Sequence, residues 1–128
     1  MTSTHKKVGY PPKSNATEDQ TLANYAARGT ENVLKILEGR WKLVIIFHLF
    51  ASPVLRFSEL EKVIPEVSQK MLTQQLRELE SDGVVERTVY PQVPPRVEYA
   101  LTTWGRALCP ALDALLKWAS MKEGSSDI

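Results

Sequence analysis

The chain contains 128 residues, 43% of them hydrophobic, which suffices for one hydrophobic core but hardly for two. Its 16 basic and 15 acidic residues leave a formal net charge of +1, so the chain as a whole does not attract nucleic acid strongly. Cys109 is the only cysteine, which excludes an internal disulfide and a multi-cysteine metal site and favours a reducing cytoplasm.

The first third of the chain changes from polar to strongly apolar. Residues 1–20 are polar and lack apolar periodicity, so we expect a disordered arm there. Helical periodicity follows over residues 22–37 and ends near Gly39, with packing residues Val33, Leu34, Ile36 and Leu37. Residues 40–50 are apolar nearly all round, which predicts a central helix wrapped by others. Their apolar run is far shorter than the roughly 20 residues that span a bilayer, so we expect a soluble protein without a membrane segment.

A short strand and a third helix are predicted next. Pro53 breaks the second helix, and residues 54–57 can form one short strand. Ser58 is the expected cap of a helix that runs through residue 63. The inner face of this helix is expected to hold Leu60, Val63 and Ile64. Pro65 ends it, and a short turn leads to the next helix.

Residues 68–83 form the most strongly patterned segment. On a helical wheel its packing side holds Met71, Leu72, Gln75, Leu76 and Leu79. Its opposite side holds Lys70, Thr73, Gln74 and Arg77. Ser68 can cap the first turn, and Gly83 can end the helix in a left-handed conformation. Many amphipathic helices with this pattern only face solvent, and the leucine seam also fits a short coiled coil, so the neighbouring elements must decide its role.

The helix is followed by a predicted β-hairpin. Polar residues alternate with β-formers over residues 84–90 and again over residues 96–101. The connection PQVPP contains three prolines, which remove amide donors and stiffen the tip. A stiff hairpin after a helix-turn-helix is typical of a wing. Arg87 and Arg96 lie on it and can reach phosphate or the minor groove, or can simply face solvent.

The last predicted helix starts near Thr102 or Thr103 and carries a broad apolar stripe as far as Trp118. This stripe exceeds what a single small core needs, which indicates a second copy of the chain as partner. Pro110 is expected to bend the helix, and Cys109 is expected to be a small packed residue. Residues 121–128 are expected to form a flexible tail.

These elements, in this order, resemble the HxlR-type family of winged helix-turn-helix transcription regulators. The resemblance rests on GRWKLVII at residues 39–46, on nearly all of residues 56–108, and on PALDALLKW at residues 110–118. It implies a winged helix-turn-helix, mainly α with a small β-hairpin, which we place at residues 21–120. It also implies a prokaryotic, cytoplasmic homodimer that pairs through its terminal helices and represses or activates genes from a palindromic operator. Some members sense electrophiles through a cysteine before the first core helix, but here Arg28 stands near that position.

The resemblance makes double-stranded DNA the expected partner. The candidate DNA-binding residues are Ser68, Gln69, Lys70, Thr73, Gln74, Arg77, Arg56, Arg87 and Arg96. Gln74 can pair with adenine, Lys70 or Arg77 with guanine, and Thr73 with a thymine methyl group or a phosphate. The three remaining arginines would add mainly sequence-independent affinity. Residues 52–101 hold six basic and eight acidic side chains, so any DNA surface must be a local patch.

One other function is compatible with part of the pattern, and enzymatic activity is not. A winged-helix module that binds protein instead of DNA would suit the mild negative charge of residues 52–101. An enzyme would need a nucleophile with its base, a metal cluster or a phosphate-binding glycine loop, and no CxxC, HxxxH or GxGxxG pattern occurs. We therefore expect no enzymatic activity, no metal and no cofactor, whereas a small-molecule effector stays open.

Overall fold

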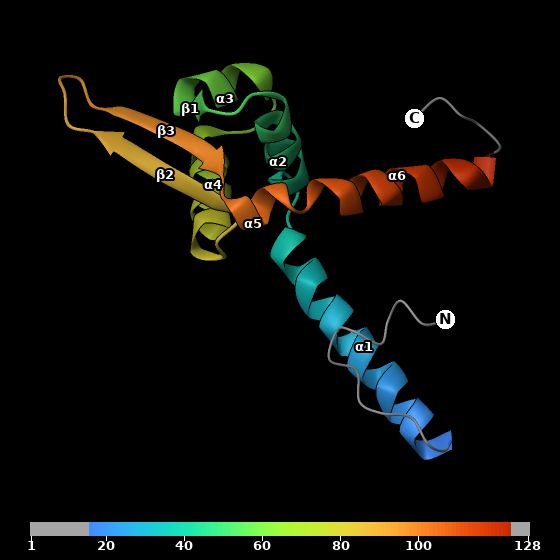
Figure 1. Cartoon of the computed structure of the whole chain (residues 1–128). Coiled ribbons are helices and arrows are strands. Elements are labelled where there is room, and N and C mark those ends of the chain that lie inside the picture. Colours follow the sequence, from blue (N-terminus) through green and yellow to red (C-terminus); the bar gives the residue numbers. More distant parts are fainter. Residues whose placement is uncertain (1–15, 124–128) are drawn as a thin grey trace. The chain divides into compact units, whose positions relative to one another are not determined.

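The computed structural model describes residues 16–123, and the side chains of residues 18–122 (Figure 1). The arm expected over residues 1–20 lies largely outside this range, and most of the tail expected over residues 121–128 does too. The chain divides into two compact units, of which the first ends at Glu38 and the second begins at Gly39.

The described part of the first unit is a single helix, α1 (Ala16–Leu37), which begins six residues before the start that its periodicity indicated. Glu18 and Asp19 in its first turn and Lys35 in its last turn have the charges that a helix dipole favours. Val33 and Leu34 were expected to pack, but about half of each side chain is exposed. Sequence periodicity predicts which residues share an apolar face of a helix, but it does not tell whether another element packs against that face.

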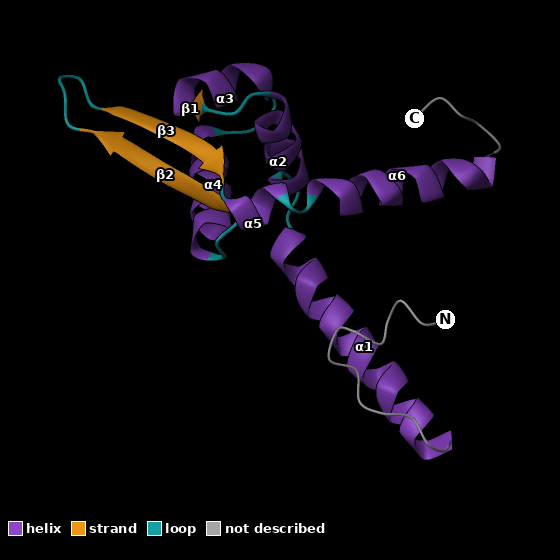
Figure 2. Ribbon diagram, viewed as in Figure 1, coloured by secondary structure: helices purple, strands orange, loops and turns teal. Residues whose placement is uncertain are grey.

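The second unit is mainly helical with a small sheet (Figure 2). In chain order its elements are α2 (Lys42–Ala51), β1 (Leu55–Arg56), α3 (Phe57–Val63), α4 (Gln69–Ser81), β2 (Val85–Tyr90), β3 (Arg96–Leu101), α5 (Thr103–Arg106) and α6 (Cys109–Glu123). The predicted hairpin is confirmed, since β2 and β3 are antiparallel from Val85 opposite Leu101 to Tyr90 opposite Arg96. The β1 strand also pairs with β3, so the sheet has three strands in the order β1-β3-β2.

The core lies where α2, α3 and α4 meet the sheet. Its fully buried side chains are Ile45, Ile46, Leu49, Leu60, Ile64, Leu72, Leu76, Leu79, Val84 and Val85. The expectation that α2 is wrapped on all sides is wrong, because Leu43, Val44 and Phe47 are each about 40% exposed. The second unit covers only one side of α2 with α3, α4 and β3. An apolar surface therefore remains open on this helix.

The predicted caps are partly confirmed. The Met71 backbone N–H donates to the Ser68 hydroxyl at 3.0 Å, which satisfies one free amide of the first turn of α4. Gly83 ends that helix with φ of 82°, a conformation that glycine adopts without strain. Ser58 is not the cap of α3: Arg56 holds that position, and its N–H donates to the Glu59 carboxylate at 2.8 Å.

Two predictions about apolar and thiol side chains are wrong. Val63 lies at the end of α3 and is 44% exposed, whereas its neighbours Leu60 and Ile64 are buried as expected. Cys109 is exposed at the start of α6 and is not packed.

The final helix is broken and not merely bent. Thr102 caps the short α5, because the Gly105 N–H donates to its hydroxyl at 3.0 Å. The chain leaves α5 at Ala107, and Pro110 occupies the first turn of α6, where its missing N–H costs no helical hydrogen bond. Figure 1 shows α6 extending away from the packed α2–α4 core.

Within the described residues, no helix is long and apolar enough to cross a membrane.

Candidate nucleic-acid interface

The α4 helix separates a buried side from an exposed polar side, as its wheel indicated. Leu72, Leu76 and Leu79 are buried in the core together with Gln75. On the other side, Lys70, Gln74 and Arg77 are exposed and Thr73 is half-buried. A shallow surface depression is lined by Gln69, Lys70, Thr73, Gln74, Arg77 and Glu78. Five of the nine candidate residues thus lie side by side on one helix face, and Ser68 caps its start.

Two hydroxyl groups near the start of this face form hydrogen bonds with the backbone of α4. The Thr73 hydroxyl donates to the Gln69 carbonyl at 2.9 Å, so its proton is engaged while its methyl group and lone pairs stay available. The Ser68 hydroxyl accepts the cap hydrogen bond and can still donate. These contacts stiffen the first turns of the helix without removing the polar surface.

Gln74 is held by a residue that the sequence reasoning missed. Its Nε2 donates to Glu78 Oε2 at 3.3 Å, and Glu78 Oε1 lies 2.6 Å from Lys42 Nζ of α2. Only 5% of the Lys42 side chain is exposed. The hydrogen bonds from Lys42 and Gln74 hold the pKa of the Glu78 carboxyl below its usual range. One signal existed in the sequence, because Lys42 is the only Lys, Arg, Asp or Glu between Trp41 and Leu55.

The two wing arginines are held by contacts within the chain. Arg87 Nε lies 3.3 Å from Glu80 Oε1, which joins β2 to the end of α4. Arg96 stacks over the Tyr90 ring with its guanidinium carbon 4.2 Å from the ring centroid, and its Nε lies 3.4 Å from Glu98 Oε2. A DNA phosphate would therefore compete with an existing partner at each arginine.

The structure brings Arg56 and Arg96 together although 39 residues separate them. The β1–β3 pairing sets Arg56 opposite Glu98, the partner of Arg96. A hollow beside the wing tip is lined by Arg56, Phe57, Ser58, Gln92, Pro94, Pro95, Arg96 and Val97. Arg87 lies apart from this hollow and is attached to α4 through Glu80. The nine candidates thus divide into the α4 face, the Arg56–Arg96 hollow and Arg87.

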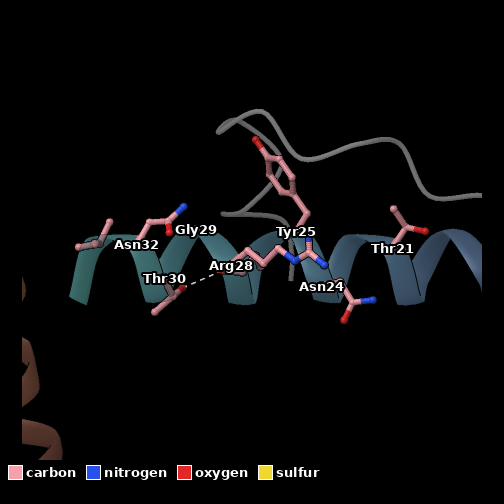
Figure 3. Close-up of a pocket in the computed structure, with 9 residues that line it drawn as sticks. Thr21, Asn24, Tyr25, Arg28, Gly29, Thr30 and Asn32 are labelled. Carbon is pink, nitrogen blue, oxygen red and sulfur yellow. Dashed lines mark hydrogen bonds between the residues drawn. The ribbon is translucent and has the colours of Figure 1, made fainter. Parts of the chain in front are cut away.

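A third depression lies on α1, in the first unit (Figure 3). Its lining runs from Thr21 to Val33, and the Thr30 hydroxyl donates to the Ala26 carbonyl at 2.9 Å. Figure 3 shows that its labelled side chains project from one helix in several directions, with Tyr25 and Asn24 on different sides. No group of three His, Cys, Asp or Glu residues suited to a metal ion occurs there or elsewhere in the described chain. We assign no site to this depression.

Two packed helices joined by a turn and followed by a hairpin define a winged helix-turn-helix protein. The chain belongs to the HxlR-like helix-turn-helix family, which matches residues 36–126 and confirms the resemblance. It is 52% identical over 90 residues to the HTH-type transcriptional regulator YtcD of Bacillus subtilis (strain 168), covering 70% of this chain and 71% of that one.

Solved structures agree with this assignment. The crystal structure of YtcD is similar with a TM-score of 0.69 at 49% identity, covering 75% of this chain and 97% of that chain. The reduced form of the redox regulator HypR is similar with a TM-score of 0.67 at 42% identity, covering 74% of this chain and 93% of that one. The predicted winged helix-turn-helix fold is confirmed.

Proposed function

We propose that this protein is a sequence-specific DNA-binding transcriptional regulator whose helix α4 enters the major groove. The observation that carries this proposal is the division of α4 between a buried leucine side and an exposed face of Lys70, Thr73, Gln74 and Arg77. A helix fits the major groove, where every base pair presents a different pattern of donors and acceptors. Lys70 and Arg77 are hydrogen-bond donors, Gln74 carries an amide, and Thr73 carries a methyl group. These are the kinds of group that recognise the edges of base pairs in the major groove.

The other candidates would position the protein on the DNA backbone. The hollow beside the wing tip is lined by Arg56 and Arg96, and these two arginines would bind one phosphate together once Arg96 leaves Glu98. Arg87 would leave Glu80 to reach a second phosphate. Because the overall charge is near neutral, these contacts and the α4 face must supply the affinity locally.

We further propose that the regulator acts as a homodimer on a palindromic operator. Supporting evidence is the exposed apolar surface of α6, where Leu115, Leu116, Trp118 and Met121 are 41% to 74% exposed. Such a surface usually marks a partner contact, and a second copy is the simplest partner. Two copies would place two α4 helices about one turn of DNA apart. Sedimentation should give a dimer at micromolar concentration and a monomer for Trp118→Glu, whereas a wild-type monomer would disprove the pairing.

We also propose that the protein has no catalytic activity and that it works in the cytoplasm of a prokaryotic cell. Its family membership and its similarity to transcriptional regulators support both proposals. The single cysteine agrees with that compartment.

The decisive experiment selects bound sequences from a random DNA pool and measures affinity for the selected site. Arg77→Ala and Lys70→Ala should each weaken the selected site by roughly five-fold to 150-fold, the value of one good base contact. Lys122→Ala removes one positive charge from the last turn of α6 and should change affinity little. Equal affinity of wild type, Lys70→Ala and Arg77→Ala would refute the α4 assignment. Failure to select any sequence would leave the alternative, a winged helix that binds protein with little dependence on salt.

A further inference from the structure

The Lys42 side chain is an unusual group in the core of this protein. It lies in the first turn of α2, next to buried apolar residues, and is 95% buried. A buried ammonium group is costly unless it has a charged partner. Its partner is Glu78 of α4, at 2.6 Å, so this ion pair joins the central helix to the proposed reading helix.

The Glu78 carboxylate uses its two oxygens on two different residues. Oε1 accepts from Lys42 and Oε2 accepts from the Gln74 side-chain amide. Glu78 itself is 44% exposed, so its outer side lies at the surface that would face DNA. Lys42 is fixed by the core around it, and it therefore fixes the carboxylate, which in turn holds the end of Gln74.

This arrangement selects one of the two orientations of the Gln74 amide. An ionised carboxylate only accepts hydrogen bonds, so the NH₂ end of the amide must point towards Glu78 and the oxygen away from it. One of the two N–H groups is used, and the second N–H and the oxygen stay free. These two groups are the donor and the acceptor that a glutamine needs to bind both N7 and N6 of adenine.

We propose that Glu78, held by Lys42, is a positioning residue that orients Gln74 and thereby sets the base preference at one operator position. The proposal rests on the proposed function, since it requires α4 to read DNA. Glu78 need not touch a base. Its negative charge lies close to the phosphate backbone and opposes it, so the residue lowers general affinity for DNA while raising discrimination between bases. A residue with only a structural role would not affect these two quantities in opposite directions.

The test measures binding of the full chain to the selected operator and to versions with one base pair changed. Gln74→Ala first identifies the position that Gln74 reads, because discrimination falls there alone, by roughly five-fold to 150-fold. Glu78→Gln should lower discrimination at the same position several-fold and leave the position read by Arg77 unchanged. Its affinity for unrelated DNA should stay equal or rise. In a Gln74→Ala background, Glu78→Gln should cause no further loss of discrimination.

Lys42→Met supplies a second, independent variant, because it keeps most of the buried stem and removes the charge that fixes Glu78. It should lose the same discrimination as Glu78→Gln. If it does not fold, Glu78→Gln still decides, since the amide oxygen that replaces the carboxylate still accepts from the buried Lys42 ammonium. The inference is overturned if Gln74→Ala changes no base preference, if Glu78→Gln keeps full discrimination, or if it loses discrimination equally at every position. Absence of DNA binding by the wild-type chain would instead refute the proposed function.

Discussion

The junction between the wing and α5 should be highly sensitive to one methyl group. Gly105 is buried, and a Cβ at this position would overlap the Val84 carbonyl oxygen and lie 3.3 Å from Leu101 Cδ2. The Val84 carbonyl cannot move freely, because it accepts from the Thr102 backbone N–H at 3.0 Å, and the neighbouring Gly83 carbonyl accepts from the Thr102 hydroxyl at 2.6 Å. In Gly105→Ala, either the overlap stays or α5 moves away from the end of α4.

Both outcomes cost stability of a similar size. Forcing an extra methyl group into a packed site costs about 1–3 kcal/mol. Moving α5 away gives up the Thr102 N–H bond to the Val84 carbonyl and the Thr102 hydroxyl bond to the Gly83 carbonyl, at about 1 kcal/mol each. We therefore expect Gly105→Ala to lose about 2 kcal/mol, a substantial part of the roughly 5–15 kcal/mol that stabilises a typical domain.

Urea unfolding followed by tryptophan fluorescence measures this loss. For slopes of about 1–3 kcal/mol per molar urea, the midpoint should fall by about 0.7–2 M at fixed protein concentration. Two other glycines provide matched controls, because a Cβ at Gly83 or Gly29 would meet nothing within 4 Å. Gly83→Ala should cost only the strain of its positive φ, about 1 kcal/mol, and Gly29→Ala within α1 should not destabilise. A Gly105→Ala midpoint no lower than that of Gly83→Ala would refute the reasoning.

Three further predictions follow from single contacts. Ser68→Ala should lower the free energy of unfolding by about 1 kcal/mol, measured by urea unfolding, because it removes a side-chain cap; an unchanged midpoint would contradict this. Glu80→Gln should release Arg87 and raise affinity for unrelated DNA at low salt, with a steeper salt dependence; weaker binding would contradict the idea that the ion pair with Glu80 keeps Arg87 from phosphate. Because the pKa of Glu78 is depressed, its contribution to stability is present above the ordinary value of 4.5 and is lost as pH falls through the folded value. An NMR titration should find this low pKa in the wild type and a higher pKa, nearer the ordinary value, in Lys42→Met, where the Gln74 hydrogen bond remains.

The sequence predicted those features whose causes lie within a few residues. The Ser68 cap, the two sides of α4, the left-handed Gly83 and the hairpin of β2 and β3 all depend on local spacing, and the structure contains each of them. Family membership was also readable, because the matching segments are nearly continuous. The role of the α4 face in reading DNA remains a prediction.

Most of the features that were missed depend on contacts between distant segments. The two-residue strand β1 is too short to reveal its pairing with β3. The Lys42–Glu78 pair joins residues 36 positions apart, and the sequence pattern of neither helix predicts that the two residues are in contact. The exposure of Phe47 and Cys109 was missed for a related reason, because periodicity cannot tell how many neighbours surround a helix. The Arg56 cap was missed because a glutamate from the first turn replaces the usual capping side chain.

The central position of β3 in the sheet bears on the kinetics of DNA binding. Because β3 pairs with β1 on one side and with β2 on the other, the base of the wing is joined through β1 to the start of α3. A reading surface that is already formed needs no ordering step on encounter, so different operators should be bound at similar rates. Their affinities should then differ mainly in how long each complex lasts before it dissociates.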